Sequence, residues 1–159
     1  MESRKPVQTG YLNRSGHPAI KIGIHGIHPD LQREFEALID TGFTGFLLMP
    51  IMSAFPLGLT LVGTSSYTLA DGSTSPKLLA LGTITLGGER TTGVIVLESN
   101  QCDLLLGMDF LRQSKRALAV SIQGVALVDE EIVTKFLTQD VPSATNNPST
   151  KISEPPDNG

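Results

Sequence analysis

The sequence contains no tryptophan, only one cysteine, and aromatic side chains at just 5% of its 159 residues. The single cysteine, Cys102, excludes a disulfide within the chain, and we expect a reduced thiol packed as a small apolar residue. That cysteine usage predicts a cytoplasmic location. A catalytic thiol is the weaker alternative, because no histidine lies near Cys102 in the sequence.

Long apolar runs and an excess of basic charge are also missing. No segment approaches the ~20 apolar residues that a membrane helix needs, and residues 1–5 are not followed by the apolar core of a secretory signal. The formal net charge is −4, and no basic patch stands out. We therefore expect neither a membrane nor a nucleic acid among the partners of this chain.

What is present fits one globular domain with a modest core, since 40% of the residues are hydrophobic and 18% are charged. Short apolar segments separated by Gly, Pro, Asn and Asp predict an all-β, or mainly β, chain with one short helix. We expect a flexible N-terminal arm over residues 1–12, whose end is alternatively the start of an edge strand. The domain follows over residues 13–138, and a disordered polar tail over residues 139–159.

The stretch from residue 33 to 50 is central to this interpretation. Phe35, Ala37 and Ile39 alternate with other residues, which predicts a half-buried strand ending at Asp40, and the continuous apolar run 46–49 predicts a buried strand. A carboxylate between two core strands is costly unless hydrogen bonds satisfy it. It is either the acceptor of an Asx-type turn or a catalytic group held at a strand end.

The remaining elements are predicted from periodicity and turn residues. A first hairpin contains the alternating strand 18–24 and returns towards Asp40. Two further hairpins span residues 64–97, and their turns lie at Asp71-Gly72 and Gly87-Gly88. The other expected elements are a helical turn at 51–55, a buried strand at 104–106, a helix at 108–114, and a hairpin of strands 117–122 and 125–129. Residues 132–137 fit neither helix nor strand clearly.

Histidines at positions 25 and 28 raise the question of a metal site. Their turn contains Gly26 and Pro29, so it is not a helix that presents both rings on one face, and Asp30 completes no known ligand spacing. We expect no metal ligands here and histidines exposed in a loop.

Three motifs in a fixed order carry a family resemblance: residues 38–42 (Leu-Ile-Asp-Thr-Gly), 70–73 (Ala-Asp-Gly-Ser) and 105–111 (Leu-Leu-Gly-Met-Asp-Phe-Leu). Together they resemble the retropepsin-like aspartic peptidases, over residues 19–128. The wording Asp-Thr-Gly-Phe-Thr-Gly-Phe is most similar to a small bacterial branch of that family. The resemblance implies a closed, barrel-like fold with one lobe per chain, and an aspartic endopeptidase that needs no cofactor.

The resemblance also assigns roles. Asp40 would be the catalytic carboxylate, Thr41 would brace the active-site loops, and Gly42 would bring a backbone N–H to the carboxylate. Aspartic peptidases need two carboxylates that share one proton, and this chain has one such motif. It would therefore act on peptides as a homodimer. The turn of Ala70, Asp71 and Gly72 would be a substrate-covering flap, or else a plain solvated hairpin.

Two departures from the family pattern leave alternatives open. Phe43 stands where many relatives have Ala, and its ring would narrow the cleft, fill core, or join a dimer contact. The hairpin at 117–129 continues past the last family motif and would either build or block a dimer interface. Two other functions remain as well: a catalytically silent peptide- or protein-binding module, and a structural dimerisation domain in which Asp40 only caps a turn.

Overall fold

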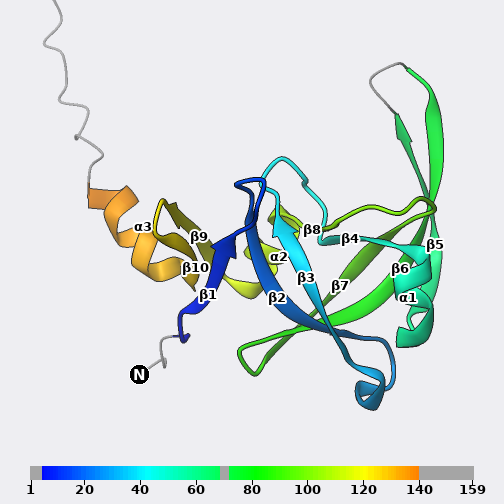
Figure 1. The fold of residues 1–159 in the computed structure, drawn as a ribbon, viewed down its shortest axis with the longest axis horizontal. Coiled ribbons are helices and arrows are strands. Elements are labelled where there is room, and N and C mark those ends of the chain that lie inside the picture. Colours follow the sequence, from blue (N-terminus) through cyan, green and yellow to red (C-terminus); the bar gives the residue numbers. More distant parts are fainter. Residues whose placement is uncertain (1–4, 69–71, 140–159) are drawn as a thin grey trace, which may run out of the picture.

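The computed structural model describes residues 5–68 and 72–139, and within them the chain is mainly β (Figure 1). This confirms the predicted fold class. None of the helices in the described part is long and apolar enough to cross a membrane. The strands are β1 (Gln8–Leu12), β2 (Pro18–His25), β3 (Arg33–Ile39), β4 (Leu47–Pro50), β5 (Thr60–Thr68), β6 (Thr74–Leu86), β7 (Glu89–Glu98), β8 (Leu104–Leu106), β9 (Arg116–Ser121) and β10 (Gly124–Asp129).

Six strands close into a barrel in the order β2-β3-β8-β4-β7-β6, because β6 also pairs with β2. β8 runs parallel to β3 and antiparallel to β4, so it lies between the two strands that flank the Asp40 turn. Leu106 pairs with Ile39 on one side and with Leu47 on the other. This interleaving brings segments some 65 residues apart in the sequence to the same end of the barrel.

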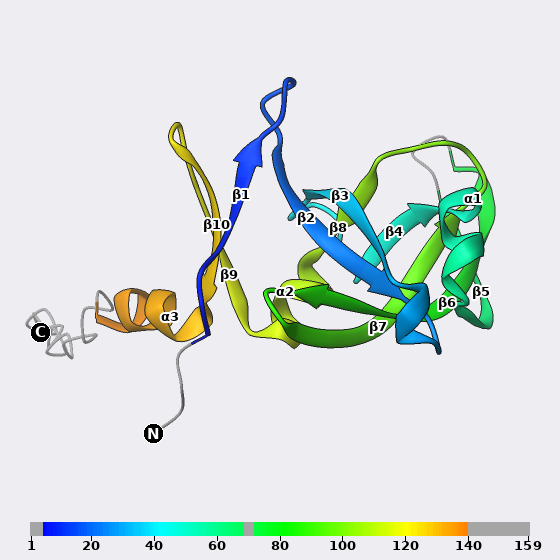
Figure 2. The same cartoon turned by 60° about the horizontal axis from the view of Figure 1, so that its bottom comes forward.

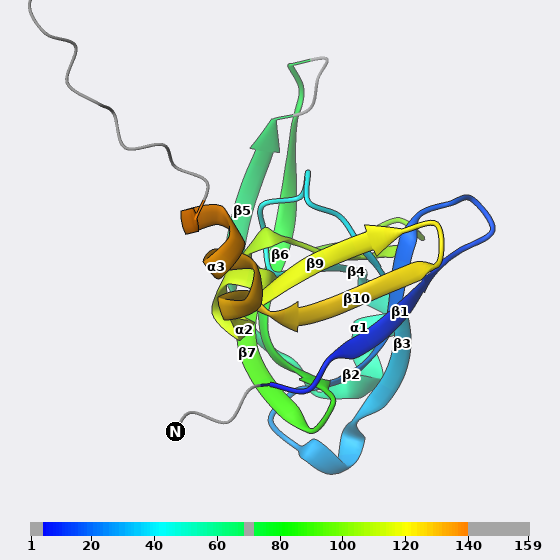
Figure 3. The same ribbon diagram turned by 90° about the vertical axis from the view of Figure 1, so that its left-hand side faces the viewer.

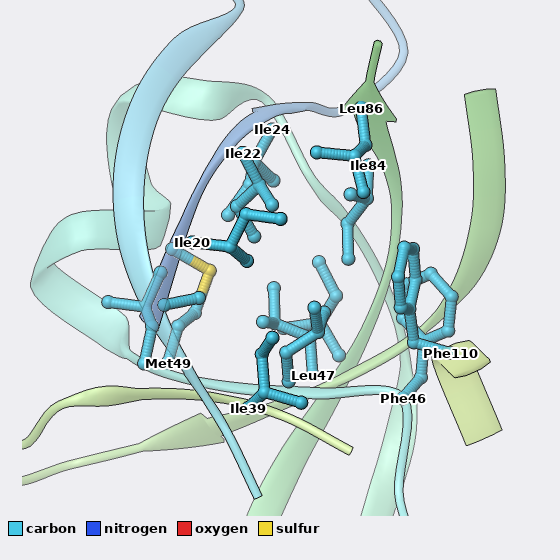
Figure 4. Close-up of a cluster of buried hydrophobic side chains, with 14 of the residues drawn as sticks. Ile20, Ile22, Ile24, Ile39, Phe46, Leu47, Met49, Ile84, Leu86 and Phe110 are labelled. Carbon is cyan, nitrogen blue, oxygen red and sulfur yellow. The ribbon is translucent and has the colours of Figure 1, made fainter. Parts of the chain in front are cut away.

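The barrel interior is filled by aliphatic side chains at alternate strand positions (Figure 4). Ile20, Ile22 and Ile24 are each at most 1% exposed, as expected when one face of a strand is fully covered. Phe46 meets Phe110 edge to face, with ring centroids 5.7 Å apart, which fixes the helix that follows β8 against the barrel.

The helices are short, and two of them begin directly after Pro50 and Gly107. The predicted helical turn after Pro50 and the predicted helix after Gly107 are both confirmed. The segment 132–137, which the pattern left unassigned, belongs to a helix. The helical elements are η1 (Pro29–Leu31), α1 (Ile51–Ala54), η2 (Phe55–Leu57), α2 (Met108–Ser114) and α3 (Glu130–Gln139).

A second, three-stranded sheet stands beside the barrel, in the order β1-β10-β9 (Figure 2). β1 belongs to both parts, because its first half pairs with β10 and its second half pairs with β2. The flexible arm expected over residues 1–12 is therefore wrong for residues 8–12, where the alternative expectation of a strand is confirmed. The tail expected over residues 139–159 lies, from residue 140 on, outside the described residues.

Charged side chains clamp this sheet to the barrel. The buried Arg116 guanidinium donates to Glu89 Oε2 at 2.8 Å and to the carbonyl oxygen of Pro6 at 2.5 Å. The Asp129 carboxylate accepts the backbone N–H groups of Lys5 and Glu131, both at 3.1 Å. Asp129 thereby ties the N-terminal segment to the sheet and satisfies one free N–H at the start of α3.

Asp129 predicts a pH dependence of stability. The backbone hydrogen bond from Lys5, supported by that from Glu131, lowers the pKa of the Asp129 carboxyl. A lowered native pKa stabilises the fold above the unfolded pKa, and that contribution is lost as pH falls through the native pKa, below about pH 4. Asp129→Asn should therefore unfold at lower urea than the parent at pH 7, with the difference shrinking at pH 3. A constant difference across this range would contradict the assignment.

Candidate active site

Asp40 stands immediately after β3, where the chain leaves the barrel. Its backbone N–H donates to the Leu106 carbonyl oxygen at 3.0 Å, and its own carbonyl accepts the Phe43 N–H at 3.2 Å. The Gly42 N–H donates to the carboxylate Oδ1 at 2.8 Å. The predicted contact between the Gly42 N–H and the Asp40 carboxylate is thus present. This hydrogen bond closes an Asx-type turn. Backbone contacts fix the half-buried carboxylate in place.

Among residues 5–68 and 72–139, no cationic side chain forms an ion pair with this carboxylate. The ion pairs found there all involve other acidic residues. Asp109, the acidic residue of the third family motif, is bonded to other side chains of its own helix. Its Oδ2 accepts from Gln113 Nε2 at 2.6 Å, and its Oδ1 pairs with Arg112. Asp109 is therefore a structural residue of α2 and not a second reactive carboxylate.

Three further backbone hydrogen bonds join the Asp40 turn to the segment between β8 and α2. The Gly107 N–H donates to Phe46, the Met108 N–H to Phe43, and the Asp109 N–H to Gly45, at 3.1, 2.9 and 3.2 Å respectively. All three hydrogen bonds use main-chain atoms, so they require the two backbones to approach closely.

Glycine at position 107 is a steric requirement of this approach. A Cβ there would lie 2.2 Å from the Gly45 carbonyl oxygen and 2.6 Å from the Phe43 ring. A Cβ at Gly45 would lie 2.4 Å from the same ring. The Phe43 side chain therefore fills the space that these two glycines leave. Phe43 is half-buried and fills this local gap, and it does not belong to the core cluster found among the described residues.

A hollow of about 500 Å³ opens beside Asp40 and Thr41. Its walls come from Leu38 and Leu105, on β3 and β8, and from Leu118 and Val120 on β9. Sequence reasoning missed the contribution of β9, which lies almost 80 residues from Asp40. The sequence predicted a strand here, but no sequence signal placed Leu118 and Val120 beside Asp40.

The predicted flap lies only partly within the described residues. β5 and β6 form the expected hairpin, paired as far as Thr68 with Thr74, and Gly72 is exposed with φ +81°. Ala70 and Asp71 lie outside the described residues. The hairpin projects beyond the barrel (Figure 1), and its role as a substrate cover stays a prediction.

The sequence predicted that the histidines in the turn after strand 18–24 are exposed. For His25 this prediction is wrong. Its side chain is only 5% exposed at the end of β2, and its Nδ1 lies 2.8 Å from the Gly26 carbonyl oxygen. Within the described part of the chain, no group of three or more His, Cys, Asp or Glu side chains is arranged to hold a metal ion.

Comparison with known proteins assigns the family. A family model described as "gag-polyprotein putative aspartyl protease" matches residues 31–113, just over half of the chain, so the protein belongs to this family of aspartyl proteases. The structure is also similar to the EIAV protease complexed with the inhibitor HBY-793. That match has a TM-score of 0.54 at 15% identity, and covers 68% of this chain and 97% of the other. No curated protein matches the sequence.

These matches confirm the resemblance to retropepsin-like aspartic peptidases and the barrel-like fold. The family match contains the Asp40 turn, the β5–β6 hairpin and the β8–α2 segment. It ends before β9, so the strand that walls the Asp40 hollow lies outside the region that the family model matches.

The close approach at Gly107 yields a stability prediction. Gly107→Ala should destabilise the fold by about 3 kcal/mol, because its methyl group meets a backbone carbonyl that cannot move without breaking the turn. Gly88→Ala is the control, since Gly88 has a positive φ of +82° but open space around it, and should cost about 1 kcal/mol. Urea denaturation measures both, and equal losses would argue against the steric account.

Proposed function

We propose that this protein is an aspartic endopeptidase that hydrolyses peptide bonds with a water molecule activated by Asp40 from each of two subunits. The observation that carries the proposal is the Asp40 carboxylate itself. It is held by the Gly42 N–H at the end of a strand and faces an open hollow, and no cationic side chain within the described residues pairs with it. Membership of an aspartyl protease family supports the same chemistry.

The chemistry requires two such carboxylates. When two lie about 3 Å apart, they cannot both ionise and so share one proton; aspartic proteases are the standard example of this behaviour. The ionised member takes a proton from water as general base, and the protonated member donates a hydrogen bond to the scissile carbonyl. Since this chain contains one Asp-Thr-Gly motif, the second carboxylate comes from the partner subunit's Asp40.

The neighbouring residues take supporting roles in this proposal. Gly42 donates its N–H to the carboxylate and leaves room for the attacking water, because it has no side chain. Thr41 is exposed beside Asp40, where its hydroxyl can reach across a two-fold axis. An extended peptide would lie between the dyad and the two β5–β6 hairpins. A cytoplasmic location is part of the proposal, and it is supported by the lone thiol of Cys102.

Cleavage of a diverse peptide mixture, read by mass spectrometry from mildly acidic to neutral pH, tests the activity. Asp40→Asn should lower the cleavage rate at least about 100-fold, because a general acid–base group is removed. Asparagine keeps an oxygen that accepts the Gly42 N–H, so the variant should unfold at nearly the same urea concentration as the parent.

Three outcomes would count against the enzyme. Cuts that persist in Asp40→Asn would arise from a contaminating protease. A folded parent that binds peptides without cutting them would support the binding module instead. A large stability loss in Asp40→Asn would favour the purely structural cap.

The two-subunit site predicts a concentration dependence. At protein concentrations below the dimer dissociation constant, cleavage per milligram should rise in proportion to concentration, because only dimers contain both carboxylates. Dilution series with a single fluorogenic peptide measure this. Cleavage per milligram that stays constant down to concentrations at which sedimentation shows monomers would exclude an intersubunit dyad.

A further inference from the structure

A shielded ion pair joins the β5–β6 hairpin to the barrel. The Lys77 ammonium group donates to both carboxylate oxygens of Glu98, at 2.7 and 2.6 Å. The two side chains are 14% and 16% exposed, whereas every other ion pair in the described part of the chain has a partner that is at least 37% exposed. Taking two charges out of water offsets much of their attraction, so we interpret this pair by the position it fixes and not by the stability it adds.

The pair lies where the hairpin leaves the barrel. Backbone pairing between β6 and β7 begins at Leu78, which lies opposite Leu97, so Lys77 and Glu98 come directly after the last paired position. Among the described residues, positions 74–77 of β6 pair only with β5. Figure 3 shows the two strands projecting past the barrel. The ion pair therefore extends the contact between hairpin and barrel by one position beyond the backbone ladder.

The rest of the hairpin base is loosely connected. The pairing register of β5 shifts between Leu61 and Gly63, and the φ of Gly63 is +155°, a conformation that other residues rarely adopt. Leu61 and Leu78 of the hairpin line a hollow of about 250 Å³ together with Phe55 of η2. Because one strand is irregular and space is left beside it, we expect the angle of the hairpin to depend on the ion pair.

The same carboxylate contacts the segment that leads to the Asp40 hollow. Glu98 is the last residue of β7, and its Oε1 accepts the Ser99 N–H at 2.9 Å. Residues 99–103 then lead into β8, whose Leu105 lines the hollow beside Asp40. One side chain thus connects the base of the hairpin with the segment that enters a wall of the candidate site.

We propose that Lys77 and Glu98 are positioning residues, whose ion pair holds the β5–β6 hairpin at the angle that suits a peptide bound beside Asp40. This rests on the proposed function, because it needs a peptide in the Asp40 hollow. Neither side chain takes part in the chemistry. The pair orders the hairpin before the peptide arrives, so binding loses less conformational entropy. Its removal should therefore raise KM and leave kcat nearly unchanged.

The charge state of the pair allows the test to be made under ordinary assay conditions. The hydrogen bond from Lys77 lowers the pKa of the Glu98 carboxyl. The carboxylate is therefore protonated only when pH falls through this lowered pKa, below the usual glutamate value of about 4.3. The ion pair is intact throughout the mildly acidic to neutral range in which cleavage is measured.

The double variant Lys77→Met/Glu98→Gln tests the proposal. It removes the attraction without leaving an unpaired charge in a shielded place, and an amide oxygen can still accept the Ser99 N–H. The variant should raise KM for a fluorogenic peptide about 10-fold and change kcat less than about twofold. Lys77→Arg should behave as the parent, because a guanidinium group also donates two hydrogen bonds to a carboxylate.

Lys21→Met is the matched control. Lys21 pairs with Glu34 on the barrel at 3.5 Å, and the two side chains are 66% and 69% exposed. An exposed pair of this kind fixes little, so the control should keep the KM and kcat of the parent.

Amide hydrogen exchange measures the same link without peptide cleavage. In the double variant, exchange should become about 10-fold faster at residues 64–68, 74–77 and 99–103, because the ion pair no longer restrains these segments. The core strands β2 and β3 should keep the exchange rates of the parent.

The outcomes separate this proposal from the peptidase. A parent that cuts no peptide, together with faster exchange confined to the hairpin and residues 99–103 in the double variant, overturns the peptidase and supports the link. Cleavage by the double variant with the KM of the parent overturns the positioning role and leaves the peptidase intact. A fall in kcat alone, or faster exchange throughout the barrel, would show that the pair only stabilises the fold, and would also overturn the positioning role.

Discussion

The close backbone contact between the Asp40 turn and the β8–α2 segment is the constraint on which the rest of the site depends. Main-chain hydrogen bonds join the two segments, and they form only because Gly45 and Gly107 leave room for each other and for the Phe43 ring. This contact fixes the end of β3, so the carboxylate of Asp40 keeps one position although no cationic side chain in the described part of the chain pairs with it. A catalytic acid benefits from such rigidity, because positioning contributes directly to rate.

Local sequence patterns predicted most of the barrel. Alternation in β2 and β3, the Asp-Gly and Gly-Gly turns, and the continuous apolar segments of β4 and β8 are each specified by a few neighbouring residues. The strand at residues 8–12 was expected only as an alternative to a flexible arm, because its pairing with β10 depends on residues more than a hundred positions away. Likewise, the burial of His25 follows from the β2–β6 closure of the barrel, which no local pattern encodes.

The candidate site, too, could be predicted from the sequence only in part. The motif identified Asp40, Thr41 and Gly42, and the structure places them in one turn with the expected N–H contact. The walls of the hollow could not be predicted, since Leu118 and Val120 reach it through the placement of a whole sheet. That placement is fixed by Arg116, Glu89 and the N-terminal segment, which are buried or paired at the root of β9. The three-stranded sheet thus supplies one wall of the hollow beside Asp40.

Subunit mixing measures the central claim, the shared carboxylate pair, most directly. Asp40→Asn protein is added to an equal amount of the parent and allowed to exchange subunits, and peptide cleavage is then followed at fixed parent concentration. If the dyad needs Asp40 from both subunits, random pairing leaves a quarter of all dimers with two aspartates, and cleavage falls to about half of its original rate. Cleavage that stays unchanged, once exchange has been verified by native mass spectrometry, would contradict a dyad shared between subunits.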